Sequence, residues 1–110
     1  MQTSYFGKKC EGNTVAICRY PPEWWTGRVY QKLSPSAKLL ADYRGKGISE
    51  AEYGSRYNEE VLSQLDPQIV FNELGEDAIL LCFEKTGVFC HRRLVADWFE
   101  RKLGIKVNEV

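Results

Sequence analysis

Five residues with reactive or charged side chains lie close together late in the sequence: Cys82, Glu84, Cys90, His91 and Arg92. They flank a turn between an uninterrupted apolar segment and an amphipathic one, a pattern typical of a β-strand that leads into an α-helix. In open α/β sheets, ligands bind outside the carboxyl ends of the strands, where such a junction lies. The free N–H groups at the helix start, together with Arg92, would attract an anion. The segment therefore predicts an anion-binding site beside a potentially reactive thiol.

The same residues also fit an enzyme, with Cys90 or Cys82 as nucleophile and with Glu84 and His91 as acid and base. Neighbouring helical residues point in different directions, so we expect His91 to pair with Cys82, Cys18 or Glu84 rather than with Cys90. The plainer alternative is that the cysteines fill the core, because cysteine is among the most buried residue types. The sequence holds no P-loop, no Gly-x-Ser-x-Gly and no Cys-x5-Arg phosphatase loop, so it names no reaction.

Thiols and the single histidine could also bind a metal. However, the chain has no Cys-x-x-Cys pair, and the Cys-x7-Cys-His spacing of Cys82, Cys90 and His91 is not that of a standard zinc knuckle. We therefore expect neither a metal nor another cofactor.

A second group of candidates lies near the expected ends of the first two strands. Arg19 is followed by Pro-Pro and by Trp24 and Trp25. Aromatic rings beside an arginine can stack on a base and hold a phosphate, although the tryptophans could equally close the core or an oligomer interface. The hydroxyls of Ser4 and Tyr5 could orient a ligand or merely cap their strand.

Hydrophobic periodicity and turn signals predict the elements that position these residues. Strands are expected at 1–6, 14–18, 78–83 and 105–110, the last at a sheet edge. Helices are expected from 34 to about 45, from 49 to about 65, from 66 to 74 and from 88 to 103. Tyr43, Tyr53 and Tyr57 are expected in the core, although a tyrosine at the top of this stripe could reach the site. Ile69, Val70 and Leu74 are expected on the inward face of the third helix.

This order of elements predicts a single α/β domain over residues 1–110, with a small parallel or mixed four-stranded sheet flanked by about four helices. A chain of this length buries roughly 60–70% of its unfolded surface, which leaves a homodimer open as a further source of stability.

Charge and hydropathy exclude several classes of function. Fifteen basic residues balance fifteen acidic ones, so the net charge is zero and nucleic-acid binding is not expected. No apolar run approaches the roughly 20 residues of a membrane span, and the start carries no apolar leader, so we expect a cytoplasmic protein without membrane contact. Its four cysteines are then expected to be free thiols.

The motifs resemble those of a bacterial and phage family called domain of unknown function 488. The resemblance covers nearly the whole chain and is carried above all by Leu80-Leu81-Cys82-Phe83-Glu84-Lys85 and Phe89-Cys90-His91-Arg92. It implies an α/β fold with Cys82, Glu84, Cys90, His91 and Arg92 at one mouth, and it adds Lys85 and Phe89 to the ligand-binding candidates. It implies no reaction.

Three functions follow as hypotheses. The first is binding of a small phosphate-bearing ligand, above all a nucleotide or a nucleotide-derived signal. The protein would then act as a sensor or as a sponge that sequesters the ligand. A sponge would suit a short, phage-borne member of the family. The second is a Cys/Glu/His-dependent enzyme that acts on a nucleotide or nucleoside. The third is a protein-interaction module with Trp24, Trp25 and Phe89 as exposed anchors.

Overall fold

Five short strands form one parallel sheet in the computed structural model, which describes residues 1–110, in the order β3-β2-β4-β1-β5. The strands are β1 (Gln2–Tyr5), β2 (Thr14–Ala16), β3 (Arg28–Val29), β4 (Ile79–Cys82) and β5 (Asn108–Glu109). Every pair of neighbours runs parallel, and β4 pairs with β1 on one side and with β2 on the other. The expected α/β class is confirmed. The expectation of four strands misses β3, because its two exposed residues carry no strand pattern.

The helices are α1 (Ala37–Ala41), α2 (Glu50–Glu60), α3 (Pro67–Leu74) and α4 (His91–Leu103), with a π-helical turn η2 (Asp42–Lys46) directly after α1. Single 3-10 turns, η1 (Gln31–Leu33) and η3 (Leu62–Gln64), precede α1 and follow α2. Four helices were expected, and four are found. The last one begins at His91 rather than at residue 88, which places the preceding residues in an extended loop.

Capping side chains set the helix starts at Ser49 and Asp66 as the sequence predicted, whereas α1 is capped by Ser36 and not at the expected residue 34. The hydroxyl of Ser36 accepts a hydrogen bond from Leu39 N, and that of Ser49 accepts one from Glu52 N. The carboxylate of Asp66 accepts bonds from the first N–H groups of α3. Each of these bonds pairs an N–H that the helix itself cannot satisfy.

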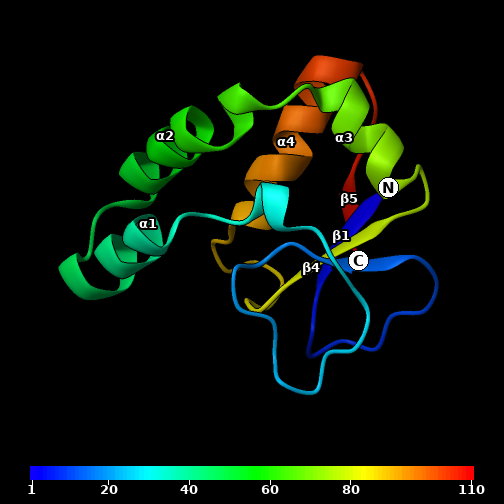
Figure 1. Ribbon diagram of the computed structural model, residues 1–110, viewed down its shortest axis with the longest axis horizontal. Helices are drawn as coiled ribbons and strands as arrows, with labels where there is room; N and C mark the ends of the chain where they lie inside the picture. Colours follow the sequence, from blue (N-terminus) through cyan, green and yellow to red (C-terminus); the bar gives the residue numbers. More distant parts are fainter.

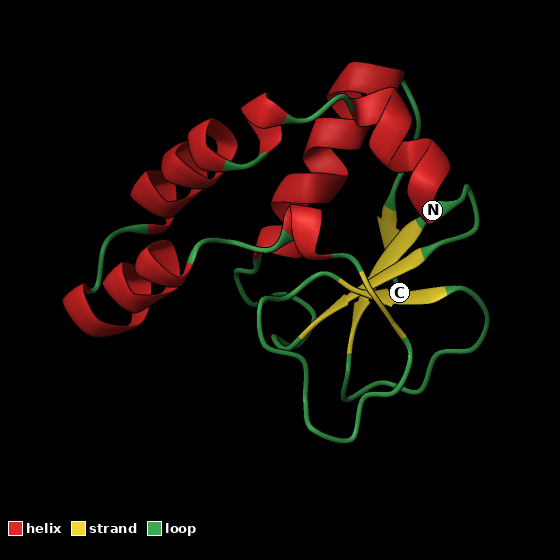
Figure 2. Ribbon diagram, in the orientation of Figure 1, coloured by secondary structure: helices red, strands yellow, loops and turns green.

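The helices gather on one side of the sheet in the view of Figure 1, with α3 and α4 packed together near the strands. The helices α1 and α2 extend to the left as an arm, and α2 contacts α4. Below the strands in the same view lie only loops (Figure 2). Within the arm, Arg56 of α2 donates to the carboxylate of Asp42 at 2.8 Å, which joins η2 to α2.

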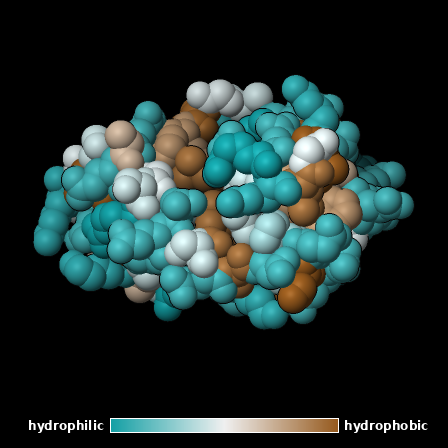
Figure 3. All heavy atoms as spheres, turned by 90° about the horizontal axis from the view of Figure 1, so that it is seen from above, coloured by the Kyte–Doolittle hydropathy of each residue, from teal (hydrophilic) through white to brown (hydrophobic).

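The core lies between the helices and the sheet and includes Tyr57, Leu80 and Phe99, which are fully buried. On α3, Val70 and Leu74 are buried as expected, but Ile69 is 56% exposed. That expectation was wrong because adjacent helical residues lie about 100° apart, so the face that buries Val70 turns Ile69 outward. The face seen from above is mainly hydrophilic, with hydrophobic atoms between the arm at the left and the middle of the picture (Figure 3). No helix combines the length and apolar character that a bilayer crossing requires.

Candidate functional site

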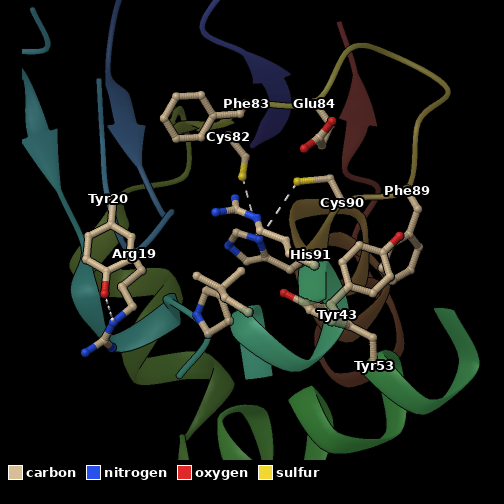
Figure 4. A pocket seen from close by; sticks show the side chains of 13 residues that line it. Arg19, Tyr20, Tyr43, Tyr53, Cys82, Phe83, Glu84, Phe89, Cys90 and His91 are labelled. Atoms are coloured by element: carbon tan, nitrogen blue, oxygen red, sulfur yellow. Dashed lines mark hydrogen bonds between the residues drawn. The ribbon is translucent and has the colours of Figure 1, made fainter. Parts of the chain in front are cut away.

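A cavity of about 340 Å³ opens at the carboxyl ends of β2 and β4, next to the start of α4. This is the position where parallel α/β sheets bind ligands. Cys82, Cys90 and His91 form its floor (Figure 4). Ten further residues surround the floor: Arg19, Tyr20, Pro35, Leu40, Tyr43, Arg44, Tyr53, Phe83, Glu84 and Phe89.

The floor brings two thiols and one imidazole together. Cys82 ends β4, Cys90 precedes α4, and His91 is the first residue of that helix. The Nδ1 atom of His91 lies 3.6 Å from Cys82 Sγ and 3.8 Å from Cys90 Sγ. All three residues are buried, with 4–6% of their surface exposed, yet each lines the cavity.

A backbone contact fixes the orientation of the imidazole. The Nε2 atom of His91 lies 2.8 Å from the carbonyl oxygen of Ile17. A carbonyl oxygen can only accept, so Nε2 carries the hydrogen and, in the neutral ring, Nδ1 presents its lone pair to the two sulfurs. The ring also packs against Tyr57, with centroids 5.4 Å apart.

The expectation that Cys90 and His91 point apart was wrong. Cys90 has φ −154° and ψ 146°, so it is extended and lies outside the helix. The spacing of helical residues therefore does not determine the direction of the Cys90 side chain. The expected pairing of His91 with Cys82 is also present.

The surroundings of the two floor thiols push their pKa values apart. A hydrogen bond from the Cys82 thiol lowers the pKa of Cys90, and this effect, with the contact to His91, outweighs the opposite effect of burial. The same bond and burial raise the pKa of Cys82. The shared proton therefore resides on Cys82, and Cys90 is the more acidic thiol. Burial raises the pKa of the nearby Cys18 to about 11.

Arg92 does not line the cavity, contrary to expectation. Its side chain is fully buried, and its Nη2 donates to Glu109 Oε2 at 2.6 Å. The Nη1 atom is buried and has no hydrogen-bond partner. The position right after His91 turns Arg92 to another side of α4, toward β5, which explains the difference. Glu109 was not singled out in the sequence, because the edge strand that carries it gave no sign of facing α4.

Four other expected ligand-binding residues also lie outside the cavity. Ser4 is fully buried and donates to the backbone oxygen of Val110, so it secures the C-terminal segment. Tyr5 pairs with Cys82 in the ladder between β1 and β4. Trp24 is 64% exposed and contacts Phe6 and Trp25 edge-on. Lys85 is exposed in the loop after β4.

The cavity does include Arg19, Cys82, Glu84, Phe89, Cys90 and His91 from the expected set. Glu84 is exposed at its edge, not shielded by the apolar strand. Sequence reasoning missed Tyr20, Tyr43, Arg44, Tyr53 and Phe83 as lining residues. Tyr43 and Tyr53 were assigned to the core, and they do pack on it, but one part of each ring also faces the cavity. Arg44 lies in the π-helical turn, for which the sequence gave no signal.

Comparison with known proteins gives one match. A family model, DUF488-N3a, described as the active DUF488-N3 subclade, matches residues 7–103. No curated protein and no solved structure matches the chain.

Proposed function

The chain belongs to the DUF488-N3a family, a subclade described as active, and from this premise we propose that its cavity binds a small phosphate-bearing ligand of the nucleotide type. The observation that carries the proposal is the combination of unpaired guanidinium groups and aromatic rings around one opening. The volume of about 340 Å³ lies at the lower end of the range for small-molecule sites.

The aromatic wall supports binding of a base. Phe89, Tyr43 and Tyr53 form a cluster in which Phe89 lies 5.8 Å from Tyr43 and 5.3 Å from Tyr53, and the two tyrosines lie 5.1 Å apart (ring centroids). Every nucleobase has a π-face, so such rings bind bases by stacking with little dependence on base identity.

Two arginines support binding of a phosphate. Arg19 and Arg44 line the cavity without a carboxylate partner, whereas Arg56, Arg92 and Arg101 each form an ion pair. Arg19 contacts only Tyr20, through a bond to its hydroxyl and through its ring. A guanidinium that is free of carboxylates can hold a phosphate with two parallel hydrogen bonds.

The carboxylate of Glu84 completes the match to a nucleotide. It is the one acidic side chain of the lining and lies on the same side as Cys90 in Figure 4. A carboxylate accepts hydrogen bonds from sugar hydroxyls but repels phosphate. We therefore place the sugar near Glu84, the phosphate near Arg19 and Arg44, and the base against Phe89.

A second candidate function, turnover of the same ligand, is favoured by the acidic thiol of Cys90 beside His91 at the floor. Binding alone needs neither group. Recovery of the ligand after incubation, with its mass checked, separates sequestration from turnover.

The experiment is a thermal-shift series with nucleoside mono-, di- and triphosphates, ADP-ribose and cyclic nucleotides. Adenosine and inorganic phosphate serve as part-ligands. A ligand at one hundred times its Kd stabilises the protein by about 2.7 kcal/mol, which is a shift of several degrees for a domain of this size.

The double variant Arg19→Gln/Arg44→Gln tests the phosphate contacts. We expect it to lose the nucleotide shift while it keeps the shift with adenosine. Arg101→Gln, at the far end of α4, is the matched control and should keep both. The absence of a shift with every nucleotide would overturn the proposal.

A further inference from the structure

The distances from the imidazole nitrogen to the two sulfurs at the cavity floor match those of a tetrahedral zinc site. Zinc binds sulfur at about 2.3 Å and imidazole nitrogen at about 2.0–2.1 Å, so tetrahedral corners lie about 3.5 Å apart for S···N and about 3.8 Å for S···S. His91 Nδ1 lies 3.6 Å from Cys82 Sγ and 3.8 Å from Cys90 Sγ. All three atoms lie within 4.8 Å of one another. Only small shifts would bring them to one ion.

The imidazole is already oriented as a metal ligand. Histidines that bind zinc usually donate their other ring N–H to a carboxylate or a backbone carbonyl, which fixes the tautomer and the ring plane. The Nε2 of His91 makes this contact with Ile17 O, and Nδ1 faces the sulfurs. No change of rotamer or tautomer is needed for binding.

The chemistry of the donor set selects the metal. Two thiolates and one imidazole suit zinc, and zinc with two thiolates has no net charge, which favours a buried position. Exposed acidic groups, which often cluster without a metal, form no part of this donor set.

We propose that Cys82, Cys90 and His91 bind a zinc ion whose fourth coordination position opens into the cavity. All three residues line the cavity, and three protein ligands with one open position are typical of catalytic rather than structural zinc. In this arrangement Cys90 is a ligand rather than a nucleophile.

The consequence for the ligand rests on the proposed function. Zinc at this position would supply a bound water that is acidic enough to give up a proton near neutral pH. Glu84, at the edge of the cavity, would accept that proton and return it to the leaving group. The net reaction would consume one water and split the ligand hydrolytically, with no change in oxidation state.

The test begins with the metal alone. The protein is stripped with a chelator under reducing, oxygen-free conditions, and zinc is then titrated in the absence of nucleotide. We expect one zinc ion per chain by elemental analysis. With cobalt as probe, we expect a thiolate-to-metal charge-transfer band together with the visible bands of a tetrahedral site.

Single variants identify the ligands. Cys82→Ala, Cys90→Ala and His91→Gln should each weaken zinc binding by more than about 100-fold, beyond the effect of losing a supporting contact. Cys18→Ala is the matched control, because Cys18 is a buried thiol of the same small cluster but not one of the three donors. If a variant does not fold, an alkylation assay on the wild-type protein takes its place. In that assay, zinc should protect Cys82 and Cys90 from reaction with maleimide.

Each outcome bears on one proposal. Substoichiometric zinc, cobalt spectra without a thiolate band, or alkylation unchanged by zinc would overturn the metal site. Stoichiometric zinc without any nucleotide shift would leave the metal site standing and would sink the nucleotide proposal. If the protein shows a nucleotide-induced thermal shift but does not bind zinc, the nucleotide proposal would stand and the metal site would be overturned.

Discussion

The Nε2 atom of His91 donates to the carbonyl oxygen of Ile17 at 2.8 Å and thereby joins the first residue of α4 to the end of β2. The contact spans 74 positions of the sequence and has both partners buried. It fixes the imidazole that faces Cys82 and Cys90, and it closes the side of the cavity floor that lies next to β2.

Replacement of His91 separates this structural role from the chemistry of Nδ1. His91→Ala leaves Ile17 O unpaired in a buried place and should cost about 1–3 kcal/mol of unfolding free energy. His91→Gln can still donate to the carbonyl, so it should retain most of that stability while it loses the basic ring nitrogen Nδ1 that faces the sulfurs. Urea denaturation of both variants measures the difference. Equal losses would show that the bond to Ile17 contributes little.

Removal of Glu109 should destabilise the fold strongly without affecting the cavity. Glu109→Gln leaves the fully buried Arg92 without its counter-charge, and breaking a buried ion pair in this way costs about 3–5 kcal/mol. The exposed pair of Arg101 and Asp97 is the control, and Arg101→Gln should change stability by less than about 1 kcal/mol. Nucleotide affinity of the folded Glu109→Gln protein should equal that of the wild type. A selective loss of affinity would place Arg92 in the binding site after all.

The ion pair of Arg92 and Glu109 also predicts that the free energy of unfolding depends on pH. Burial alone would raise the pKa of Glu109, but hydrogen bonds from Arg92 and Thr3 hold it below its ordinary value of 4.5. A carboxylate with a lowered pKa in the folded state stabilises the fold above its unfolded pKa and loses this effect as the pH falls through the folded value. The gap in unfolding free energy between wild type and Glu109→Gln should therefore stay constant at neutral pH and narrow as the pH falls below the ordinary value of 4.5. A gap that does not narrow at this acidic pH would contradict the assignment.

Alkylation of the metal-free protein should distinguish its buried thiols. Cys90 lines the cavity with a lowered pKa and should react with iodoacetamide at neutral pH. Cys18 is buried outside the cavity lining, and its pKa of about 11 leaves almost no thiolate, so it should stay unmodified in the native protein. Peptide mass spectrometry after short exposure gives the order of reaction. Faster labelling of Cys18 than of Cys90 would contradict the protonation pattern at the floor.

Stacking at the aromatic wall predicts the effect of removing one ring. Phe89→Ala should weaken nucleotide binding by about 1–3 kcal/mol, or roughly 5- to 150-fold, through lost base stacking. Trp24→Ala removes a larger ring that lies outside the cavity and should leave affinity unchanged. Calorimetric titration measures both. The reverse pattern would move the ligand, or a protein partner, to the exposed ring of Trp24.

The sequence predicted the parts of the fold that local patterns encode. The apolar run of β4 and the caps of α2 and α3 each rest on neighbouring residues, and all were found. Contacts between distant segments were harder to foresee. The ion pair of Arg92 with Glu109 depends on how β5 packs beside α4, and the approach of Cys90 to His91 depends on the extended backbone of Cys90; spacing along the chain reveals neither.

The cavity is assembled from three separate stretches of the chain. The end of β4 and the start of α4 supply its floor, the segment after β2 supplies Arg19 and Tyr20, and the α1–α2 arm supplies Tyr43, Arg44 and Tyr53. The arm is braced internally by Asp42 and Arg56, so substitutions on its cavity side leave its own attachment intact. Relatives of this chain could thus diverge in what they recognise while they inherit one unchanged reactive floor. Grafting the arm of one relative onto the sheet of another would exchange ligand preference as a module.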